Sequence, residues 1–376
     1  MHVQSLKCTR CGDEYPPDEL RYRCSCGGSL DVAYDYTEID GITWEELRSR
    51  AFDHSRYRAF LPVVDPSHIV TMGGGGTPMF RAKALQEELG ADLRFKLESV
   101  NPTGSFKDRG TAVELGKALD HHAEEIVVAS TGNMGASVAA YTARANVDAR
   151  IYVPEETGGP KLKQMKSHDA DVVTVDGDYA VAAEQAWQDW EDRDRYLMGD
   201  YPYRGEGEKT VGFEIADQLD RQDLSDVSVV LPVGNGTLLH AVWKAFEELD
   251  RTGLIDETPR MVGVQAQGCN TVVNALQKGF EQVEPVDHVD TVAGAIACAD
   301  PLDGDQALAA LQDSGGTGVA VDDSDIMAAK QELAEEEGIY AEEAAAAAWA
   351  GATQVADGFG EDETVVLPIC GHGLKT

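Results

Sequence analysis

The chain has 376 residues, 43% of them hydrophobic, which is enough to bury a large core in about two domains and excludes a mostly disordered protein. Its 67 acidic and 31 basic residues give a net charge of -36, a field that repels nucleic acid and anionic lipid and excludes both as expected partners. Acidic clusters recur along the whole chain, which favours adaptation to high salt over the alternative of a moderately acidic mesophilic enzyme. No apolar run reaches the length of a membrane span and no apolar signal core opens the chain, so we expect a soluble, cytoplasmic protein.

The first 36 residues form a cysteine-rich segment. Four of the seven cysteines lie here, as Cys8, Cys11, Cys24 and Cys26. Two close pairs of thiols can supply a tetrahedral zinc site, although the second pair is spaced more tightly than usual. Residues 29–34 alternate like a short strand, and a reducing cytoplasm disfavours disulfides. We therefore predict a zinc-ribbon-like segment with a structural Zn²⁺; a ribbon that has lost its metal is the alternative.

From about residue 90 onward the pattern alternates between strands and helices. Short apolar, β-branched runs are separated by helical segments, which is typical of a largely parallel α/β sheet. The predicted strands are 93–97, 126–129, 150–153, 172–175, 227–231, 261–264 and 364–367. Before them, Thr43 and Glu46 predict a capping box that opens a helix. Ligands of such sheets bind beyond the carboxyl ends of the strands, so the turns at those ends are the candidate sites.

A lysine after the first of these strands is the strongest candidate for chemistry. Lys107 lies in the run NPTGSFKDRG, which extends from Asn101 to Gly110. A neutral, positioned lysine amine can form an imine with an aldehyde cofactor. The small residues just before it allow a tight turn and the close approach of a ligand. A lone lysine of this kind is more often a solvated surface residue, so the interpretation depends on its context.

Two turns of similar composition each follow a predicted strand and open a helix. The first, STGNMGAS, runs from Ser130 to Ser137, and the second, PVGNGTLL, runs from Pro232 to Leu239. Free backbone N–H groups at a helix start attract an anion, and glycines let the backbone wrap a phosphate. Taken alone, the first turn fits an ordinary helix cap equally well, and the second is of a common kind in α/β proteins. The second turn does not match the dinucleotide pattern Gly-x-Gly-x-x-Gly.

The ten residues from Asn101 to Gly110 resemble the cofactor-lysine motif of fold-type II pyridoxal-phosphate enzymes, and within that group they are most similar to threonine synthases. The segments 96–98 (KLE) and 76–78 (GTP) resemble the same family. The resemblance covers nearly the whole chain and implies an α/β enzyme of two domains with mostly parallel sheets. It also implies that Lys107 forms the Schiff base with pyridoxal 5'-phosphate and that Phe106 lies near the cofactor ring.

The resemblance also assigns roles to both turns. The residue that matches Asn133 contacts the ring hydroxyl of the cofactor in the family. The substrate carboxylate is implied to bind at Ser130, Thr131 and Gly132, and the cofactor phosphate at Gly234, Asn235, Gly236 and Thr237.

Several positions near the implied site depart from the family pattern. Threonine synthases have a threonine whose hydroxyl meets the pyridine nitrogen; Cys370 stands in its place, and we predict that its thiol is a weaker partner, a small buried residue being the alternative. Family members often have a different residue at the position of Met134, and the segment 338–344 lacks a proline and a serine that relatives have. Lys161 and Lys163 lie near a Gly-Lys pair of relatives and are predicted to bind a substrate phosphate; a solvated loop is the alternative.

The implied layout places the ribbon at 1–36, a large cofactor-binding domain at 37–100 and 205–376, and a smaller mobile domain at 101–204. The implied reaction converts O-phospho-L-homoserine and water to L-threonine and phosphate. A threonine or serine ammonia-lyase is the alternative, as is another β- or γ-replacement enzyme such as a cysteate or cysteine synthase. A protein-binding module on an inactive scaffold is disfavoured, because the lysine and both turns are retained. A homodimer is the family expectation.

Overall fold

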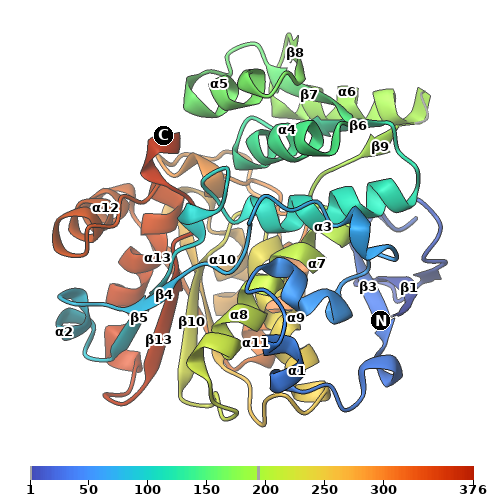
Figure 1. Ribbon diagram of the computed structural model, residues 1–376. Helices are drawn as coiled ribbons and strands as arrows, with labels where there is room; N and C mark the ends of the chain where they lie inside the picture. Colours follow the sequence, from blue (N-terminus) through green and yellow to red (C-terminus); the bar gives the residue numbers. More distant parts are fainter. Residues whose placement is uncertain (1, 193–194) are drawn as a thin grey trace.

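The computed structural model describes residues 2–192 and 195–376 of the chain, which fold into three sheets surrounded by helices (Figure 1). A six-stranded sheet has the strand order β12-β11-β10-β13-β5-β4, and a four-stranded sheet has the order β8-β7-β6-β9. A three-stranded sheet, in the order β2-β1-β3, is formed by the N-terminal segment. We call the first two sheets, each with its covering helices, the six-stranded and the four-stranded unit.

Parallel pairing dominates the six-stranded sheet, and only β4 runs antiparallel to its neighbour. Its strands are β4 (Met79–Arg81), β5 (Asp92–Lys96), β10 (Val227–Pro232), β11 (Arg260–Ala266), β12 (Thr317–Val321) and β13 (Thr364–Pro368). Helices cover both faces, because adjacent residues of β11 meet different helices: Gly263 contacts side chains of α9 and α11, whereas Val264 contacts α13. Coverage on both faces explains why these strands are continuous apolar runs.

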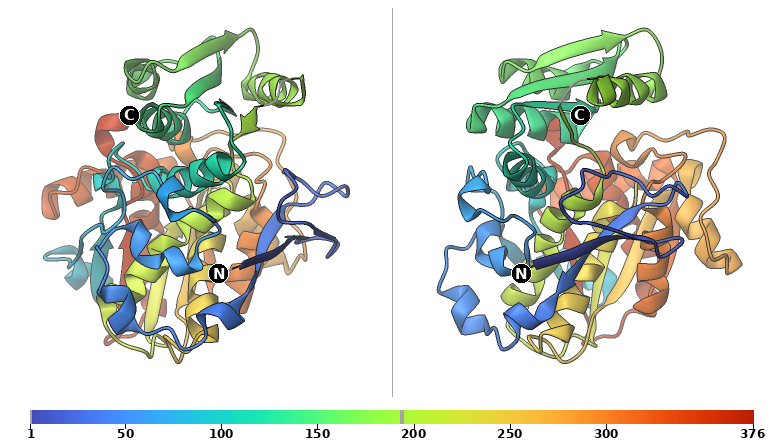
Figure 2. Two further views of the ribbon diagram at one scale, coloured as in Figure 1. Left: turned by 45° about the vertical axis from the view of Figure 1, so that its right-hand side comes forward. Right: turned by 90° about the vertical axis from the view of Figure 1, so that its right-hand side faces the viewer.

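The four-stranded sheet is parallel throughout and lies beside the six-stranded unit (Figure 2). Its strands are β6 (Glu125–Ala129), β7 (Asp148–Pro154), β8 (Asp171–Val175) and β9 (Tyr196–Leu197). Ile126 and Val128 pack with Met134 of α4, whereas Val127 and Ala129 pack with Ala182 of α6. The period-two alternation of the strand therefore supplies two separate cores, one on each face.

Thirteen α-helices are found in the described part of the chain. They are α1 (Trp44–Arg48), α2 (Leu85–Leu89), α3 (Lys107–Asp120), α4 (Asn133–Ala145), α5 (Gly159–Ser167), α6 (Tyr179–Asp192), α7 (Pro202–Glu208), α8 (Thr210–Leu219), α9 (Thr237–Arg251), α10 (Thr271–Lys278), α11 (Gly304–Asp313), α12 (Asp323–Glu336) and α13 (Glu343–Gln354). None of the described helices is long and apolar enough to cross a membrane.

The N-terminal strands β1 (His2–Cys8), β2 (Glu14–Tyr15) and β3 (Leu30–Asp35) pair antiparallel and contact both units. The Tyr34 hydroxyl donates to Glu206 of α7, and the Lys244 ammonium of α9 donates to Asp31 at 2.6 Å. In the opposite direction, Tyr22 enters the core of the four-stranded unit, where its ring centroid lies 5.0 Å from that of Trp190. The segment therefore joins the two units at one side of the molecule (Figure 2).

All seven predicted strands are present, and they form the parallel parts of the two larger sheets. The short strands β4, β9 and β12 were not predicted. The Thr43 hydroxyl caps α1 as predicted, accepting from the Glu46 N–H at 3.2 Å, but the Glu46 carboxylate pairs with Arg50 at 2.9 Å. The capping box is therefore only half formed. The predicted boundaries of the two domains stay predictions.

Candidate active site

The loop that carries Lys107 is held by the last residues of the chain. The Phe106 N–H donates to the Cys370 carbonyl at 3.0 Å, and the His372 N–H donates to the Gly104 carbonyl at 3.0 Å. Gly104 has a φ of +87°, which a residue with a side chain rarely adopts. Backbone hydrogen bonds thus hold the lysine loop against the C-terminal segment. Lys107 follows this loop as the first residue of α3.

Two carboxylates surround the Lys107 amine. Its Nζ lies 3.0 Å from Glu208 Oε1 and 3.4 Å from Asp200 Oδ1, and 4.6 Å from the centre of the Phe106 ring. Burial by itself would lower the pKa of Lys107, but the two carboxylates outweigh it and raise that pKa. Burial raises the pKa of Glu208, whose Oε2 is buried without a hydrogen-bond partner. The lysine therefore lies as an ammonium ion between two carboxylates.

The first turn joins β6 to α4 in the four-stranded unit. The Ser130 hydroxyl accepts from the N–H groups of Gly135 at 2.9 Å and Gly132 at 3.3 Å, which shapes the turn. Ser130 and Asn133 are buried, whereas Thr131 is exposed. Asn133 Oδ1 is buried and has no hydrogen-bond partner, which points to a missing ligand.

The second turn joins β10 to α9 in the six-stranded unit. Gly236 has a φ of +94°, and a Cβ placed there would lie 2.5 Å from the Asp303 carbonyl oxygen. Among the hydrogen bonds of the described residues, none is donated by the backbone N–H groups of residues 234–237. Free N–H groups ahead of a fifteen-residue helix suit a phosphate dianion.

Side-chain contacts join the turns to the lysine. The Asn235 amide donates to Asp200 at 2.5 Å, and the other oxygen of Asp200 meets Lys107. The Asn133 amide donates to Glu342 at 2.8 Å, and the Glu342 N–H donates to the Gly371 carbonyl at 3.1 Å. The second turn is therefore linked through Asp200 to the Lys107 amine, and the first turn is linked through Glu342 to the C-terminal segment that holds the lysine loop.

Comparisons with known proteins agree with this geometry. The model of the family described as pyridoxal-phosphate dependent enzyme matches residues 70–371. A threonine synthase of Methanocaldococcus jannaschii is 41% identical over 98% of this chain and 92% of its own, and one of Methanosarcina acetivorans is 41% identical over the same shares. The chain belongs to the threonine synthase family of pyridoxal-phosphate-dependent enzymes.

Solved structures of other members of the fold are similar as well. Threonine deaminase isoform 2 from Solanum lycopersicum superimposes with a TM-score of 0.69 at 23% identity, covering 96% of this chain and 95% of its own. Maize serine racemase has a TM-score of 0.68 at 19% identity, covering 79% of this chain and 88% of its own. At these identities the likeness concerns the fold, and it confirms the predicted fold-type II architecture.

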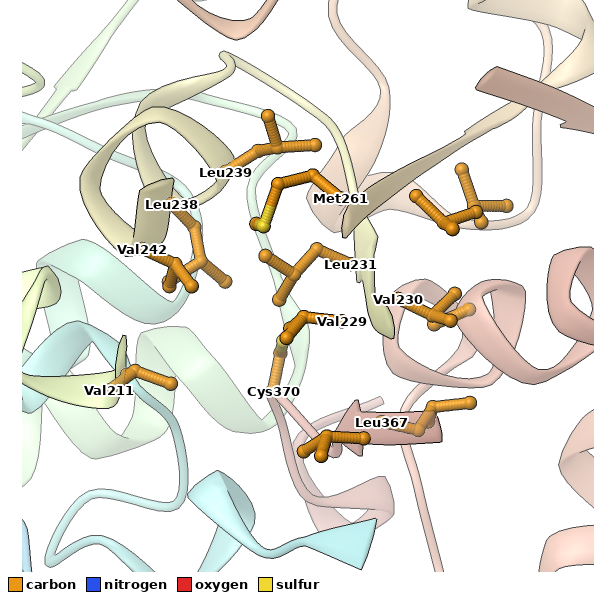
Figure 3. Packing of buried hydrophobic residues seen from close by; sticks show 14 of the residues in the cluster. Val211, Val229, Val230, Leu231, Leu238, Leu239, Val242, Met261, Leu367 and Cys370 are labelled. Atoms are coloured by element: carbon orange, nitrogen blue, oxygen red, sulfur yellow. The ribbon is translucent and has the colours of Figure 1, made fainter. Parts of the chain in front are cut away.

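The residues present fit pyridoxal phosphate, which members of this family use. The free N–H groups of residues 234–237 match its phosphate, and the unpartnered Asn133 Oδ1 marks a polar contact that the protein alone does not make. Cys370 is buried in the core with the side chains of β10, among them Val229 (Figure 3). Its thiol donates to the Pro368 carbonyl at 3.4 Å, and burial raises its pKa well above the usual range, so it stays a neutral thiol.

The predicted substrate lysines differ from each other. Lys161 Nζ lies 3.3 Å from Glu342 Oε2 at the centre of the site, whereas Lys163 is exposed on α5. A helix places residues two apart on different faces, so the pair does not converge. Met134, which departs from the family pattern, is buried in the hydrophobic core that α4 shares with β6.

Sequence reasoning missed three carboxylates at the site, those of Asp200, Glu208 and Glu342. Glu342 lies in the segment 338–344, which departs from the family pattern, and Glu208 lies in the segment 203–210, which resembles the family; these segments were the available signal. No local pattern marks the side chain of Asp200, which reaches the amine from a turn before α7.

The cysteine cluster has the geometry of a tetrahedral sulfur site. Its four sulfur atoms lie within 4.8 Å of one another, with Cys8 and Cys26 3.6 Å apart and Cys11 and Cys24 3.5 Å apart. Four thiolates about 2.3 Å from a central zinc ion would be about 3.8 Å apart. The Tyr15 hydroxyl lies 3.1 Å from the Cys24 sulfur and lowers the pKa of that thiol to about 6. The residues therefore fit Zn²⁺.

Proposed function

We propose that the chain catalyses the threonine synthase reaction, which converts O-phospho-L-homoserine and water to L-threonine and phosphate. The observation that carries the proposal is the set of contacts that links both turns and the C-terminal segment to the loop of Lys107. It is supported by 41% identity to threonine synthases over 98% of the chain.

Each motif has a part in this proposal. Lys107 would hold the cofactor, the N–H groups of residues 234–237 its phosphate, Asn133 its ring hydroxyl, and Cys370 its ring nitrogen. The substrate carboxylate would bind at the turn formed by Ser130, Thr131 and Gly132. Lys161 would meet the substrate phosphate; Lys163, being exposed, has at most a longer-range role there.

Pyridoxal phosphate, when bound, supplies an electron sink for bond breaking at the α carbon. The chain would supply the proton transfers, with the Lys107 amine moving protons at the α, β and γ carbons of the substrate. Phosphate would leave from the γ carbon, which then takes up a proton. The hydroxide of water would add at the β carbon, a proton would return to the α carbon, and the remaining proton of water would leave with the phosphate. Such chemistry needs a dry site, so we propose that residues 101–204 close over the rest of the chain on substrate binding.

The remaining parts of the proposal concern the setting of the enzyme. We propose that Cys8, Cys11, Cys24 and Cys26 bind a structural Zn²⁺. We further propose that the protein works in the cytoplasm at high salt and assembles as a homodimer. Metal analysis of the purified protein tests the Zn²⁺ site, and gel filtration in molar KCl tests the homodimer.

The cofactor assignment is tested by reduction of the purified enzyme. Protein loaded with pyridoxal phosphate should show a visible band, and borohydride should fix the cofactor onto Lys107, as read by peptide mass. Lys107→Ala should lose the band and at least ~10³-fold of the rate, because nucleophile and proton carrier are removed together. A wild-type protein that takes up no cofactor would end the assignment.

The substrate is tested by offering phosphohomoserine and threonine in parallel. Phosphate and threonine in equal amounts from phosphohomoserine support the proposal. Release of 2-oxobutanoate from threonine, with phosphohomoserine left unchanged, would instead identify an ammonia-lyase.

A further inference from the structure

Glu342 is a buried carboxylate that joins the two units at the active site. It precedes α13 in the six-stranded unit, and its residue is 2% exposed. Its Oε1 accepts from Asn133 Nδ2 at 2.8 Å, and its Oε2 lies 3.3 Å from Lys161 Nζ. Both partners come from the four-stranded unit, Asn133 from α4 and Lys161 from α5. One carboxylate therefore reaches both a cofactor residue and a substrate residue of the opposite unit.

The position of Glu342 is fixed by the C-terminal segment. Its N–H donates to the Gly371 carbonyl at 3.1 Å, and Ala341 forms a β-bridge with His372. A Cβ at Gly371 would lie 2.0 Å from Glu342 Oε1, so only glycine leaves room for the carboxylate. The segment that also holds the lysine loop thus sets the direction of this side chain.

The two partners of Glu342 are held to different degrees. Asn133 is buried and donates a well-formed hydrogen bond, which leaves its second amide hydrogen and its unpartnered Oδ1 directed elsewhere. Lys161 keeps its side chain 16% exposed, and Glu342 Oε2 forms no hydrogen bond despite the ion pair. An ammonium has three N–H donors, so Lys161 can contact Glu342 and still offer donors to a second anion.

We propose that Glu342 is a positioning residue that aims Asn133 at the cofactor and Lys161 at the phosphate of the substrate. It acts on the reacting groups only through these two residues. The part that concerns Lys161 rests on the proposed function, because it assumes a phosphorylated substrate. The part that concerns Asn133 requires only that the site binds pyridoxal phosphate.

The test compares Glu342→Gln with Glu343→Gln in the loaded enzyme. Glutamine keeps an acceptor for Asn133 and removes the charge that holds Lys161. Glu343 is the matched control, because it pairs with Lys330 at 2.6 Å outside the site. Spectral titration of the bound cofactor should give a dissociation constant for phosphohomoserine that rises about 10-fold in Glu342→Gln, the loss of one charge-assisted contact. L-homoserine, which lacks the phosphate, should bind as in the wild type.

Two further variants separate the roles. Lys161→Ala should weaken the binding of phosphohomoserine but not that of L-homoserine. If Glu342 acts through Lys161, adding Glu342→Gln to Lys161→Ala should not raise the dissociation constant further. Glu342→Ala removes the acceptor for Asn133 as well, so it should shift the visible band of the bound cofactor, whereas Glu343→Gln should not. If Glu342→Gln binds phosphohomoserine more tightly than the wild type, the proposal that Glu342 aims Lys161 is wrong, because the carboxylate would then simply repel the phosphate of the substrate. An unshifted band in Glu342→Ala would overturn the Asn133 part.

Failure of the proposed function would look different. If the wild-type enzyme binds phosphohomoserine no better than L-homoserine, the phosphorylated substrate assumed in the proposed function is ruled out. The band shift of Glu342→Ala would still decide whether Glu342 positions Asn133.

Discussion

The two turns of the active site have the same place in the fold but are built differently. Each follows the carboxyl end of a parallel strand and opens a helix, residues 130–133 before α4 and residues 234–237 before α9. In the first turn a local serine hydroxyl satisfies two backbone N–H groups. In the second turn no N–H of residues 234–237 is satisfied by a described residue, and the shape is set by distant contacts with Asp200 and Asp303.

This difference suits two kinds of ligand. A turn shaped by its own side chain keeps its form whether or not a ligand is present, so a substrate can enter and leave it. A turn shaped by the surrounding fold is preorganised with unsatisfied donors and binds a resident anion tightly. This comparison supports the proposal that the substrate carboxylate binds at the first turn and the cofactor phosphate at the second.

The largest expected effect is at Gly236. A Cβ at this residue meets the Asp303 carbonyl oxygen at 2.5 Å, and its φ is +94°. Gly236→Ala should therefore open the second turn and weaken cofactor retention by at least ~100-fold, measured as the dissociation constant of pyridoxal phosphate. Gly253→Ala is the control, because its φ is +71° but nothing lies within 4 Å. Equal loss of cofactor in both variants would show that strain alone, not the shape of the turn, is responsible.

The next effect concerns Asp303, whose carboxylate accepts from the Thr237 hydroxyl at 2.6 Å. Burial raises the pKa of Asp303 from 3.8 to about 6. The folded state therefore holds this proton more tightly than the unfolded state, so the residue costs stability progressively as the pH rises from about 4 to about 6. The free energy of unfolding of Asp303→Asn minus that of the wild type should therefore be about 1 to 3 kcal/mol larger at pH 7 than at pH 4.5. Urea unfolding of both proteins at the two pH values checks this, and an unchanged difference would contradict it.

A smaller effect is expected at the first turn. Ser130→Ala removes the acceptor of the Gly132 and Gly135 N–H groups, which should lower the free energy of unfolding by about 1 kcal/mol. The Michaelis constant for the amino-acid substrate should rise several-fold, while the affinity for the cofactor stays as it was. Ser167→Ala is the control, because that exposed hydroxyl donates only to a carbonyl of its own helix. If Ser130→Ala loses the cofactor, the proposed division, with the substrate at the first turn and the cofactor phosphate at the second, is wrong.

The parts of this molecule that local sequence predicts are those with a local cause. Runs such as Val227–Leu231 are apolar because both faces of the sheet are covered, and the lysine and both turns follow such strands. The strands β4, β9 and β12 escaped prediction because β4 has three residues and β9 has two, too few to show a period, and a glycine interrupts β12 (TGVAV). Their pairing is decided by their neighbours in the sheet.

The rest of the site has causes far away in the chain. Glu342 is 209 residues from Asn133 and Glu208 is 101 residues from Lys107, so no spacing rule connects them. Lys161 and Lys163 looked equivalent in sequence, and only the helix of α5 separates their directions. The capping box is half formed for a local reason, since the Glu46 carboxylate pairs with Arg50, four residues further on.

The smallest expected effect is at Cys370, which we propose as the partner of the cofactor ring nitrogen. Its buried thiol donates to the Pro368 carbonyl at 3.4 Å. Cys370→Ser supplies a stronger donor of nearly the same volume, so the rate should change by no more than about 3-fold and the visible band should move slightly. Cys269→Ser is the control for the burial of a thiol, because its buried thiol makes the same 3.4 Å contact with a backbone carbonyl, that of Ile296. If both variants lose the same stability and only Cys370→Ser moves the band, the thiol faces the cofactor. If neither moves it, Cys370 is a packing residue in the segment that follows β13, and the ring nitrogen has another partner.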